Sequence, residues 1–438
     1  MPKHTEDRGN DRRAPHRARF PLRWRLGVFA LTLISYEAAG LTSRRVWKIE
    51  PGSEEIRRDY LRSARVWRDV ETSEMDILAG PAPRLFSFDQ SVTCTYHTPG
   101  RLLGGASTKF LCEADGVVYR VKYLRGGKPS SNREVFAEVA ATRLFWALGF
   151  GADRAFPVRI LCHGCPADPQ VGPTLEERRD QRYQTKTRSL GLAVIELPFE
   201  GATIEEGSGQ GWTWSELDAL AGTSGARREI GETERAERRK HVEALKLLQV
   251  FAQHGDCKPQ QQRLVCLPDG ILDNSSRPDA WAAEGNEESG EGAILDAAGT
   301  SCTRSFALVD DLGSTFGGAG DFTTASAKMD LTHWAEKEVI DHDHYLRTGG
   351  QCKAVLNVSS SCEGGIENPL ITESGRRFLV DRLSRLSDLQ VRDLFVAARV
   401  DQLETNGGEH GREATVDSWV RAFKDKVQQL ASVQCSDP

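Results

Sequence analysis

The chain has 438 residues, of which 39% are hydrophobic, and it contains 41 glycines and 18 prolines. This length suffices for one large two-lobed domain or two ordinary domains, and the composition is that of a soluble globular protein with long polar loops. A formal net charge of −6 gives no general electrostatic basis for binding nucleic acid, so nucleic acid is not an expected partner.

Residues 1–45 are predicted to form a basic tail with a signal peptide or membrane anchor. Residues 1–25 hold eight Lys or Arg, and the apolar run 26–34 and small residues follow. This is the layout of a secretory signal, although Glu37 departs from the usual cleavage pattern. The run is shorter than the ~20 apolar residues of a membrane span, yet an uncleaved tether over 26–40 remains an alternative. We expect an exported or membrane-anchored protein; the competing interpretation is a basic arm on a cytoplasmic protein.

Residues 46–89 are predicted to form an N-terminal helical extension, because apolar residues recur at helical spacing between 53 and 78. A strand-rich region, 90–200, follows. It holds two expected strands around an Asp-Gly turn (110–112 and 117–123), a helix over 131–149 that ends at a glycine, and a buried strand within 191–199.

Residues 201–434 are predicted to be mostly helical. The expected elements are a helix over 241–253, a strand over 306–309, and helices over 376–386, 389–398 and 416–430. Residues 268–301 are rich in Asp, Glu, Gly, Asn and Ser, which predicts a disordered insertion.

Ten cysteines form an even set, as a disulfide framework requires. Cys162 and Cys165 make a single CxxC, which is a weak indication of zinc or redox chemistry because a structural zinc site needs four ligands. Cys352 and Cys362 flank a polar loop and suit a local disulfide. The alternative is ten buried thiols in a cytosolic protein.

Four separated features carry chemistry, and they follow one order along the chain. Lys122 ends the strand VYRVK, after a small-residue stretch that contains Gly104, Gly105 and Ser107. Glu138 lies on the next helix, Asp256 lies in HGDCKPQQ directly after a helix, and Asp311 lies in DLG directly after a strand.

Phosphoryl transfer from ATP needs these residue types. A strand lysine (Lys122) holds the α- and β-phosphates and a helix glutamate (Glu138) fixes it, while Gly104, Gly105 and Ser107 would cover the phosphates. Asp256 would orient the attacking hydroxyl, and Lys258 would neutralise the γ-phosphate. Asp311 and the amide oxygen of Gln261 would hold Mg²⁺ or Mn²⁺.

These motifs resemble those of the protein kinase superfamily. HGDCKPQQ resembles the kinase catalytic loop with Gly255, Cys257 and Gln261 in place of arginine, leucine and asparagine; DLG resembles the DFG motif, and VYRVK resembles the VAIK strand. A closer likeness is to the secretory-pathway kinases of the Golgi casein kinase type, in the segments 137–150 and 311–317. HipA-type and type II phosphatidylinositol 4-kinases have related, looser patterns. There is no GxGxxG, so the phosphate loop is the largest departure.

The resemblance implies an α+β, two-lobed protein-kinase-like fold, with an N-lobe over 90–200 and a helical C-lobe over 201–434. It implies ATP and Mg²⁺ or Mn²⁺ as cofactors and a hydroxyl acceptor on a protein Ser/Thr, a glycan or a lipid. The alternatives are a pseudokinase that binds nucleotide or a partner, and an enzyme that transfers AMP. Some residues also have rivals: Glu134 for the helix glutamate and Asp310 for the metal ligand. For His254, a structural role as a hydrogen-bonded core histidine is favoured over acid–base work.

Overall fold

The structure of the protein is a computed structural model that describes residues 47–81, 85–100, 103–105, 107–180, 182–205, 211–222, 231–273, 300–318, 328–356, 366, 368–403 and 415–436. All of them belong to one compact unit, Thr42–Pro438. The predicted signal or anchor within residues 1–45 lies outside the described residues, as does the 274–299 part of the predicted insertion. Among the helices that the described ranges contain, none has the length and apolarity of a membrane span.

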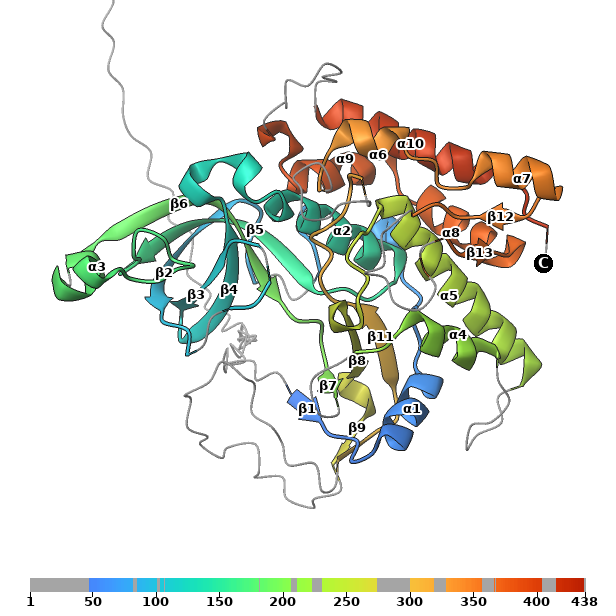
Figure 1. Cartoon of the computed structure of the whole chain (residues 1–438), viewed down its shortest axis with the longest axis horizontal. Helices are drawn as coiled ribbons and strands as arrows, with labels where there is room; N and C mark the ends of the chain where they lie inside the picture. Colours follow the sequence, from blue (N-terminus) through green and yellow to red (C-terminus); the bar gives the residue numbers. More distant parts are fainter. Residues whose placement is uncertain are drawn as a thin grey trace, which may run out of the picture. The chain divides into compact units, whose positions relative to one another are not determined.

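Five strands close into a barrel in the order β2-β3-β4-β6-β5 (Figure 1). Their bounds are β2 Gln90–His97, β3 Lys109–Ala114, β4 Val117–Tyr123, β5 Arg154–His163 and β6 Thr187–Leu197. β3 and β4 pair antiparallel around Asp115 and Gly116, which both have positive φ, as the expected Asp-Gly turn requires. Phe110, Val121 and Phe156 fill the barrel core.

Helix α2 (Glu134–Leu148) lies between the barrel and the C-terminal helices, and it contacts both β5 and α9 (Asp388–Ala397) (Figure 1). The helix is buried on nearly every face, which explains its high content of Ala, Val and Phe. It ends at Gly149, whose φ is 87°, and a Cβ there would lie 2.2 Å from the Arg68 carbonyl oxygen. The helix predicted over 131–149 is therefore observed, starting three residues later.

The C-terminal region is mainly helical. Its helices are α4 Trp214–Gly222, α5 Glu232–Ala252, α6 Leu331–Glu336, α7 His342–Thr348, α8 Glu373–Ser384, α9 and α10 Val416–Ser432; a short α3, Leu175–Asp180, precedes β6. Aromatic side chains join these helices: Trp334 packs on Phe251, Phe395 and Trp419. The helix expected over 241–253 begins earlier, at Glu232.

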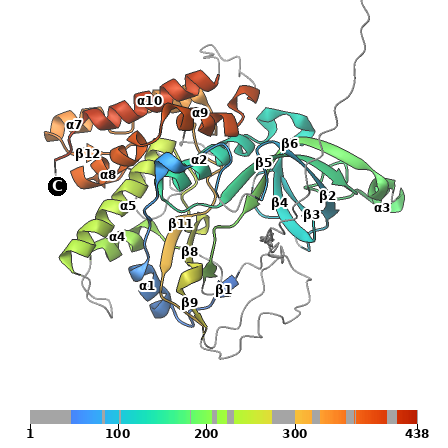
Figure 2. The ribbon, with the colours of Figure 1, turned by 180° about the vertical axis from the view of Figure 1, so that it is seen from behind.

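A four-stranded sheet, β1-β7-β8-β11, lies next to α1 (Glu54–Ser63) (Figure 2). Its strands are β1 Trp47–Ile49, β7 Ala202–Ile204, β8 Gln262–Cys266 and β11 Ser305–Val309. The prediction that residues 46–89 are helical holds only for α1. The helix ends at Ala64 because Arg65 exchanges backbone hydrogen bonds with the β11 strand, donating to Ser305 and accepting from Ala307.

The predicted insertion is narrower than 268–301. Residues 268–270 form a 3-10 turn, and β9 (Ile271–Asp273) pairs antiparallel with β10 (Thr300–Cys302). A disulfide between Cys266 and Cys302 joins this hairpin to β8. Both ends of the insertion are thus ordered by pairing and by a covalent bond.

Cysteines in the described residues form disulfides: Cys94–Cys112, Cys162–Cys165, Cys266–Cys302 and Cys352–Cys435, and Cys257 is disulfide-bonded as well. The expected Cys352–Cys362 pair is wrong. Cys352 lies in β12 (Cys352–Lys353), which pairs with β13 (Leu370–Ile371), and its Cα is 5.2 Å from that of Cys435, just beyond α10. The CxxC is a disulfide in the barrel and not a zinc site.

The arrangement is the α+β, two-lobed one expected from the sequence: a strand-rich N-terminal lobe with one central helix, followed by a mostly helical lobe. The helical lobe also contains strands β7, β8 and β11, of which only β11 was predicted.

Candidate functional site

Lys122 is the centre of the candidate site. Its ammonium is 1% exposed and lies 2.9 Å from Glu138 Oε2, 2.8 Å from Glu196 Oε1, 3.0 Å from Glu134 Oε2 and 3.4 Å from Asp311 Oδ1. Carboxylates from three segments, α2, β6 and the loop after β11, therefore converge on one lysine of β4. The three sequence-predicted residues Lys122, Glu138 and Asp311 are in direct contact.

Local geometry explains the convergence. Glu134 and Glu138 are four residues apart on α2, so both face the end of β4. In the antiparallel β4–β6 pair, Lys122 is opposite Val194 and Arg120 is opposite Glu196, so Glu196 is a diagonal neighbour of Lys122 on the same face. No chemical role was predicted for Glu196, because only the pairing of β4 with β6 brings it next to Lys122.

The carboxylates stabilise the charge on Lys122. Burial by itself lowers the pKa of this lysine, but Asp311, Glu138 and Glu196 outweigh burial and raise the pKa well above its ordinary value. Burial and the neighbouring Glu196 carboxylate raise the pKa of Glu138 well above its ordinary range. Burial would also raise the pKa of Glu196, yet Lys122 and a hydrogen bond with Glu138 lower it to about 2. Of these two glutamates, Glu196 is the one that gives up its proton more readily.

Glu134 and Glu138 were alternatives for the helix glutamate that contacts the lysine, and both contact Lys122. Glu134 also forms an ion pair of 2.6 Å with Lys328. Its carboxylate packs against Gly313 of the DLG segment, where an added Cβ would lie 2.9 Å from Glu134 Oε2. The glycine of DLG is therefore required for this close approach, and Glu134 offers an additional oxygen next to the Asp311 loop.

The HGDCKPQQ segment forms a second polar group. Lys258 Nζ lies 3.0 Å from Asp256 Oδ1, and the Gln261 side-chain amide donates to Asp256 Oδ2 over 3.2 Å. Asp256 is 14% exposed at its side chain and Lys258 is 39% exposed, so both face a solvent-accessible space. The three residues predicted in this loop therefore contact one another.

Backbone hydrogen bonds join this loop to the Asp311 loop, although 274–299 intervenes in the sequence. Antiparallel pairing of β8 with β11 places Gln262 opposite Val309, and the next residues continue the contact: the Asp310 N–H donates to the Gln261 carbonyl over 2.9 Å. The Gly255 N–H donates to the Ser314 carbonyl over 3.0 Å. Long-range strand pairing thus brings the Asp256 and Asp311 loops together.

Asp311 and Asp310 have different surroundings. Asp310 forms a 2.7 Å ion pair with Arg263 and is 10% exposed, whereas Asp311 contacts Lys122 and is 31% exposed. The Gly313 N–H donates to Asp311 Oδ1 over 3.1 Å. Burial would raise the pKa of Asp311, but Lys122 lowers it below its ordinary value. Asp311 is therefore the ionised carboxylate with an accessible face, and Asp310 is occupied by Arg263.

His254 is fully buried, consistent with the structural role favoured from the sequence. Its Nε2 lies 3.0 Å from the Asp311 carbonyl oxygen and its Nδ1 lies 3.2 Å from Gln249 Oε1. Burial lowers the pKa of His254 to about 4, so the ring is neutral and carries one N–H. The ring therefore supports the backbone of Asp311.

The small-residue stretch lies next to the site. Gly105 has a φ of 84°, a conformation that favours glycine, and a Cβ there would lie 2.9 Å from Lys109 Nζ, so the end of this lysine lies against Gly105. Gly104 is exposed, and Ser107 is buried with its carbonyl accepting from Gln170. Lys109 is opposite Lys122 in the β3–β4 pair. Lys109 was not among the residues predicted from the sequence.

The donor set fits a divalent cation held jointly with a nucleotide. Asp311 supplies a carboxylate, and Gln261 uses its amide nitrogen for Asp256, which leaves the amide oxygen for a ligand. Within the described ranges, only Cys94, Cys112 and Cys162 bring three acid, His or Cys ligand atoms within 4.8 Å, and these sulfurs are in disulfides. Mg²⁺ commonly takes one or two carboxylates and completes its shell with phosphates and water, which matches this set.

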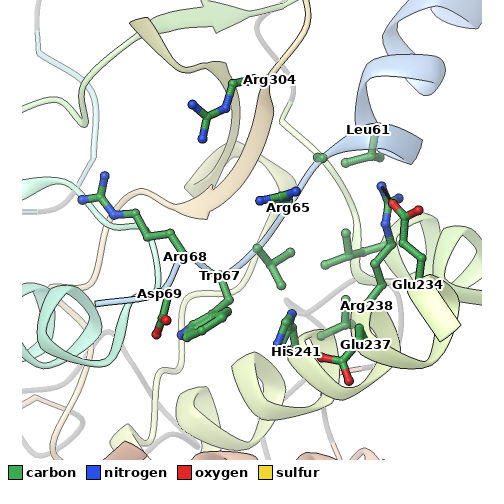
Figure 3. A pocket seen from close by; sticks show the side chains of 14 residues that line it. Leu61, Arg65, Trp67, Arg68, Asp69, Glu234, Glu237, Arg238, His241 and Arg304 are labelled. Carbon is green, nitrogen blue, oxygen red and sulfur yellow. Dashed lines mark hydrogen bonds and ion pairs between the residues drawn. The ribbon is translucent and has the colours of Figure 1, made fainter. Parts of the chain in front are cut away.

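A cavity of about 580 Å³ lies elsewhere, between residues 61–69 and α5 (Figure 3). Trp67 and His241 lie on its wall with ring centroids 4.8 Å apart. Several of its arginines are already paired: Arg68 with Glu200 at 2.6 Å, and Arg238 with Glu234 at 3.4 Å. None of the predicted site residues lines this cavity.

No model of a known protein family matches the chain, and no curated protein sequence matches it. Among solved structures, the crystal structure of a Helicobacter pylori proinflammatory kinase, CtkA, is similar with a TM-score of 0.36 and 10% sequence identity, over 79% of this chain and 99% of that chain. A likeness at this TM-score carries no conclusion about activity, which has to be inferred from the site's own residues.

Proposed function

We propose that the protein is an ATP- and Mg²⁺- or Mn²⁺-dependent phosphotransferase that acts on a hydroxyl acceptor. The observation that carries the proposal is the buried Lys122, which pairs with Glu138 of α2 and with Asp311 of the DLG loop. A lysine, a helix glutamate and a loop aspartate in this arrangement are what kinases use to hold the phosphates of ATP.

In this mechanism, Lys122 binds phosphate oxygens of ATP, and Glu138 and Glu196 hold its ammonium in place. The acceptor oxygen attacks the γ-phosphorus, the bond to the β-phosphate oxygen breaks, and ADP leaves. Asp256 orients the hydroxyl and accepts its proton, and Lys258, 3.0 Å from that carboxylate, offsets charge on the transferred group.

Asp311 and the Gln261 amide oxygen are the residues that would hold the metal, with Glu134 as a neighbouring oxygen. When bound, Mg²⁺ or Mn²⁺ neutralises the negative charge on the transferring phosphate. Asp311 suits this role because its carboxylate is ionised, partly exposed and held by the Gly313 N–H.

The acceptor class belongs to the proposal as well. A protein Ser/Thr or a glycan hydroxyl is the favoured acceptor, and a lipid hydroxyl is the remaining class. Lys258, two residues after Asp256 as in Ser/Thr kinases, favours a protein Ser/Thr among these.

The test is incubation of protein lacking residues 1–40 with γ-labelled ATP and either Mg²⁺ or Mn²⁺. We expect label in the parent and at least a 100-fold loss in Asp256→Asn and in Asp311→Ala. Asp343→Asn, an exposed carboxylate on α7, is the matched control and should keep full labelling. Mass spectrometry of the product separates added phosphate from added AMP.

The outcomes distinguish the alternatives. Metal-dependent stabilisation by ATP without any label, with Asp256→Asn unchanged, would support the pseudokinase. Addition of AMP would replace phosphoryl transfer by nucleotidyl transfer. If neither label nor ATP-dependent stabilisation appeared, the proposed function would be withdrawn.

A further inference from the structure

Lys109 is a largely buried lysine whose ammonium directly contacts no acid among the described residues. It begins β3 and is 9% exposed. Within the part of the chain that the structure describes, its ammonium has no hydrogen bond and no ion pair within 4 Å. Lys122 differs sharply, since four carboxylates surround it. A charged group on a largely buried side chain destabilises the folded protein when no partner offsets the lost hydration, so the position of Lys109 calls for an explanation.

The position of Lys109 increases that cost. Lys109 and Lys122 are direct partners across the antiparallel β3–β4 pair, so their side chains lie on the same face. Like charges at directly opposed positions destabilise a sheet. Burial lowers the pKa of Lys109, and repulsion from Lys122 lowers it further, while Glu196 and Asp311 act in the opposite direction. Two lysines thus share one face of the sheet, where their positive charges would both attract an anion.

The ammonium also lies against the small-residue stretch. A Cβ at Gly105 would come within 2.9 Å of Lys109 Nζ, and Gly105 adopts a φ of 84° that favours glycine. The Lys109 side chain therefore extends from β3 to Gly105, while its backbone is paired with that of Lys122. A polyanion held by Lys122 would lie within reach of Lys109.

We propose that Lys109 is a second phosphate-binding residue, which together with Lys122 binds the polyphosphate chain of the nucleotide. This inference rests on the proposed function and deepens it. Without a GxGxxG loop, the chain has fewer backbone donors of the usual kind for the phosphates, and a buried lysine next to Gly105 supplies charge in their place.

Lys109→Met keeps the length of the side chain and removes its charge. The proposal predicts that this variant has a higher melting temperature without ligand but a lower affinity for phosphates. The ligand-free variant should melt at a higher temperature than the parent, because an unpaired buried charge is gone. Its affinity for ATP and for inorganic triphosphate should fall about 10- to 100-fold, the range of a lost charge-assisted contact. Adenosine affinity should not change.

Lys128→Met, an exposed lysine just after β4, is the matched control and should leave all three quantities unchanged. The measurements are thermal melting without ligand and calorimetric titration with ATP, triphosphate and adenosine. Unchanged ATP affinity in Lys109→Met, with normal binding by the parent, would overturn the inference and leave the proposed function intact. A lower ligand-free melting temperature with equal losses for ATP and adenosine would also overturn it, because Lys109 would then be structural. If the parent bound neither ATP nor triphosphate, both proposals would fall.

Discussion

His254 connects the Asp256 loop to the backbone of Asp311, and its two ring contacts define its protonation. Both contacts are with oxygen atoms, but a neutral ring has one N–H. The Gln249 side-chain nitrogen is buried and has no hydrogen-bond partner among the described residues. Exchanging the two ends of the Gln249 amide lets that nitrogen donate to His254 Nδ1, while His254 Nε2–H donates to the Asp311 carbonyl. Each ring nitrogen of a neutral His254 then has a complementary hydrogen-bond partner.

This neutral state predicts how stability depends on pH. Burial lowers the pKa of His254 to about 4, compared with about 6.5 in an unfolded chain. Between these values the unfolded chain binds a proton that the folded protein does not, so the free energy of unfolding falls as pH decreases from about 6.5 to about 4. The loss attributable to this one group is about 3 kcal/mol.

We therefore expect His254→Gln to reduce the pH dependence over this window. Glutamine is uncharged and can still donate to the Asp311 carbonyl. Urea unfolding of the parent and the variant at pH 7 and at pH 4.5 measures the difference. His333→Gln, at an exposed ring on α6, serves as the control and should keep the parent's dependence. An identical dependence in His254→Gln would contradict a buried neutral His254.

Strands β9 and β10 close the ends of the insertion, so the intervening residues can be tested separately. Asp273 is directly opposite Thr300 in an antiparallel pair. Replacing residues 274–299 by Asn-Gly, the sequence of a tight hairpin turn, should therefore preserve the pairing. Because a shorter loop loses less entropy on closure, we expect the free energy of unfolding to rise by about 1–2 kcal/mol.

The same replacement should leave phosphate incorporation unchanged. Gln261 and Asp311 are held by the β8–β11 pairing, which the deletion does not touch. The measurements are denaturant unfolding and labelling with γ-labelled ATP. Loss of labelling in a fully folded deletion variant would mean that residues 274–299 take part in the reaction.

Elements that form through local interactions were predicted from the sequence, whereas several that form by pairing with distant segments were not. The α2 helix and the β3–β4 turn were predicted because spacing, a terminal Gly149 and the Asp115-Gly116 pair are local signals. Strands β1, β7 and β8 are short and form through pairing with distant segments, so no local pattern marks them. α1 stops early for the same reason: pairing of Arg65 with β11 overrides helical periodicity.

The site residues likewise separate into those that lie in local motifs and those that only the fold brings together. Lys122, Glu138, Asp256 and Asp311 were predicted because each lies within a recognisable motif. The roles of Glu134, Glu196 and Lys109 depend on which side chains the sheet and α2 bring to Lys122. A period-two reading of residues 191–197 would have placed Glu196 on the face of Val194, but only the β4–β6 register brings it to Lys122.

The disulfides extend over both lobes of the described protein. Two lie in the barrel, Cys266–Cys302 joins the β9–β10 hairpin to β8, and Cys352–Cys435 ties β12 to the end of the chain. Disulfides persist in oxidising compartments and are rare in the cytosol. Together with the basic flank and apolar run at the N-terminus, this supports the proposal that the protein is exported or membrane-anchored, with its folded part outside the cytosol.

The contribution of each disulfide should follow the length of chain that it closes. Cys352–Cys435 spans 83 residues, whereas Cys162–Cys165 spans 3. Because a cross-link stabilises mainly by restricting the unfolded chain, Cys352→Ala with Cys435→Ala should lower the free energy of unfolding by about 4–5 kcal/mol, and Cys162→Ala with Cys165→Ala by about 2 kcal/mol. Denaturant unfolding of the two double variants measures the difference, and a reducing agent should lower the melting temperature of the parent. Full stability under reducing conditions, with all thiols free in protein isolated from its own cells, would contradict both the covalent framework and the proposed location.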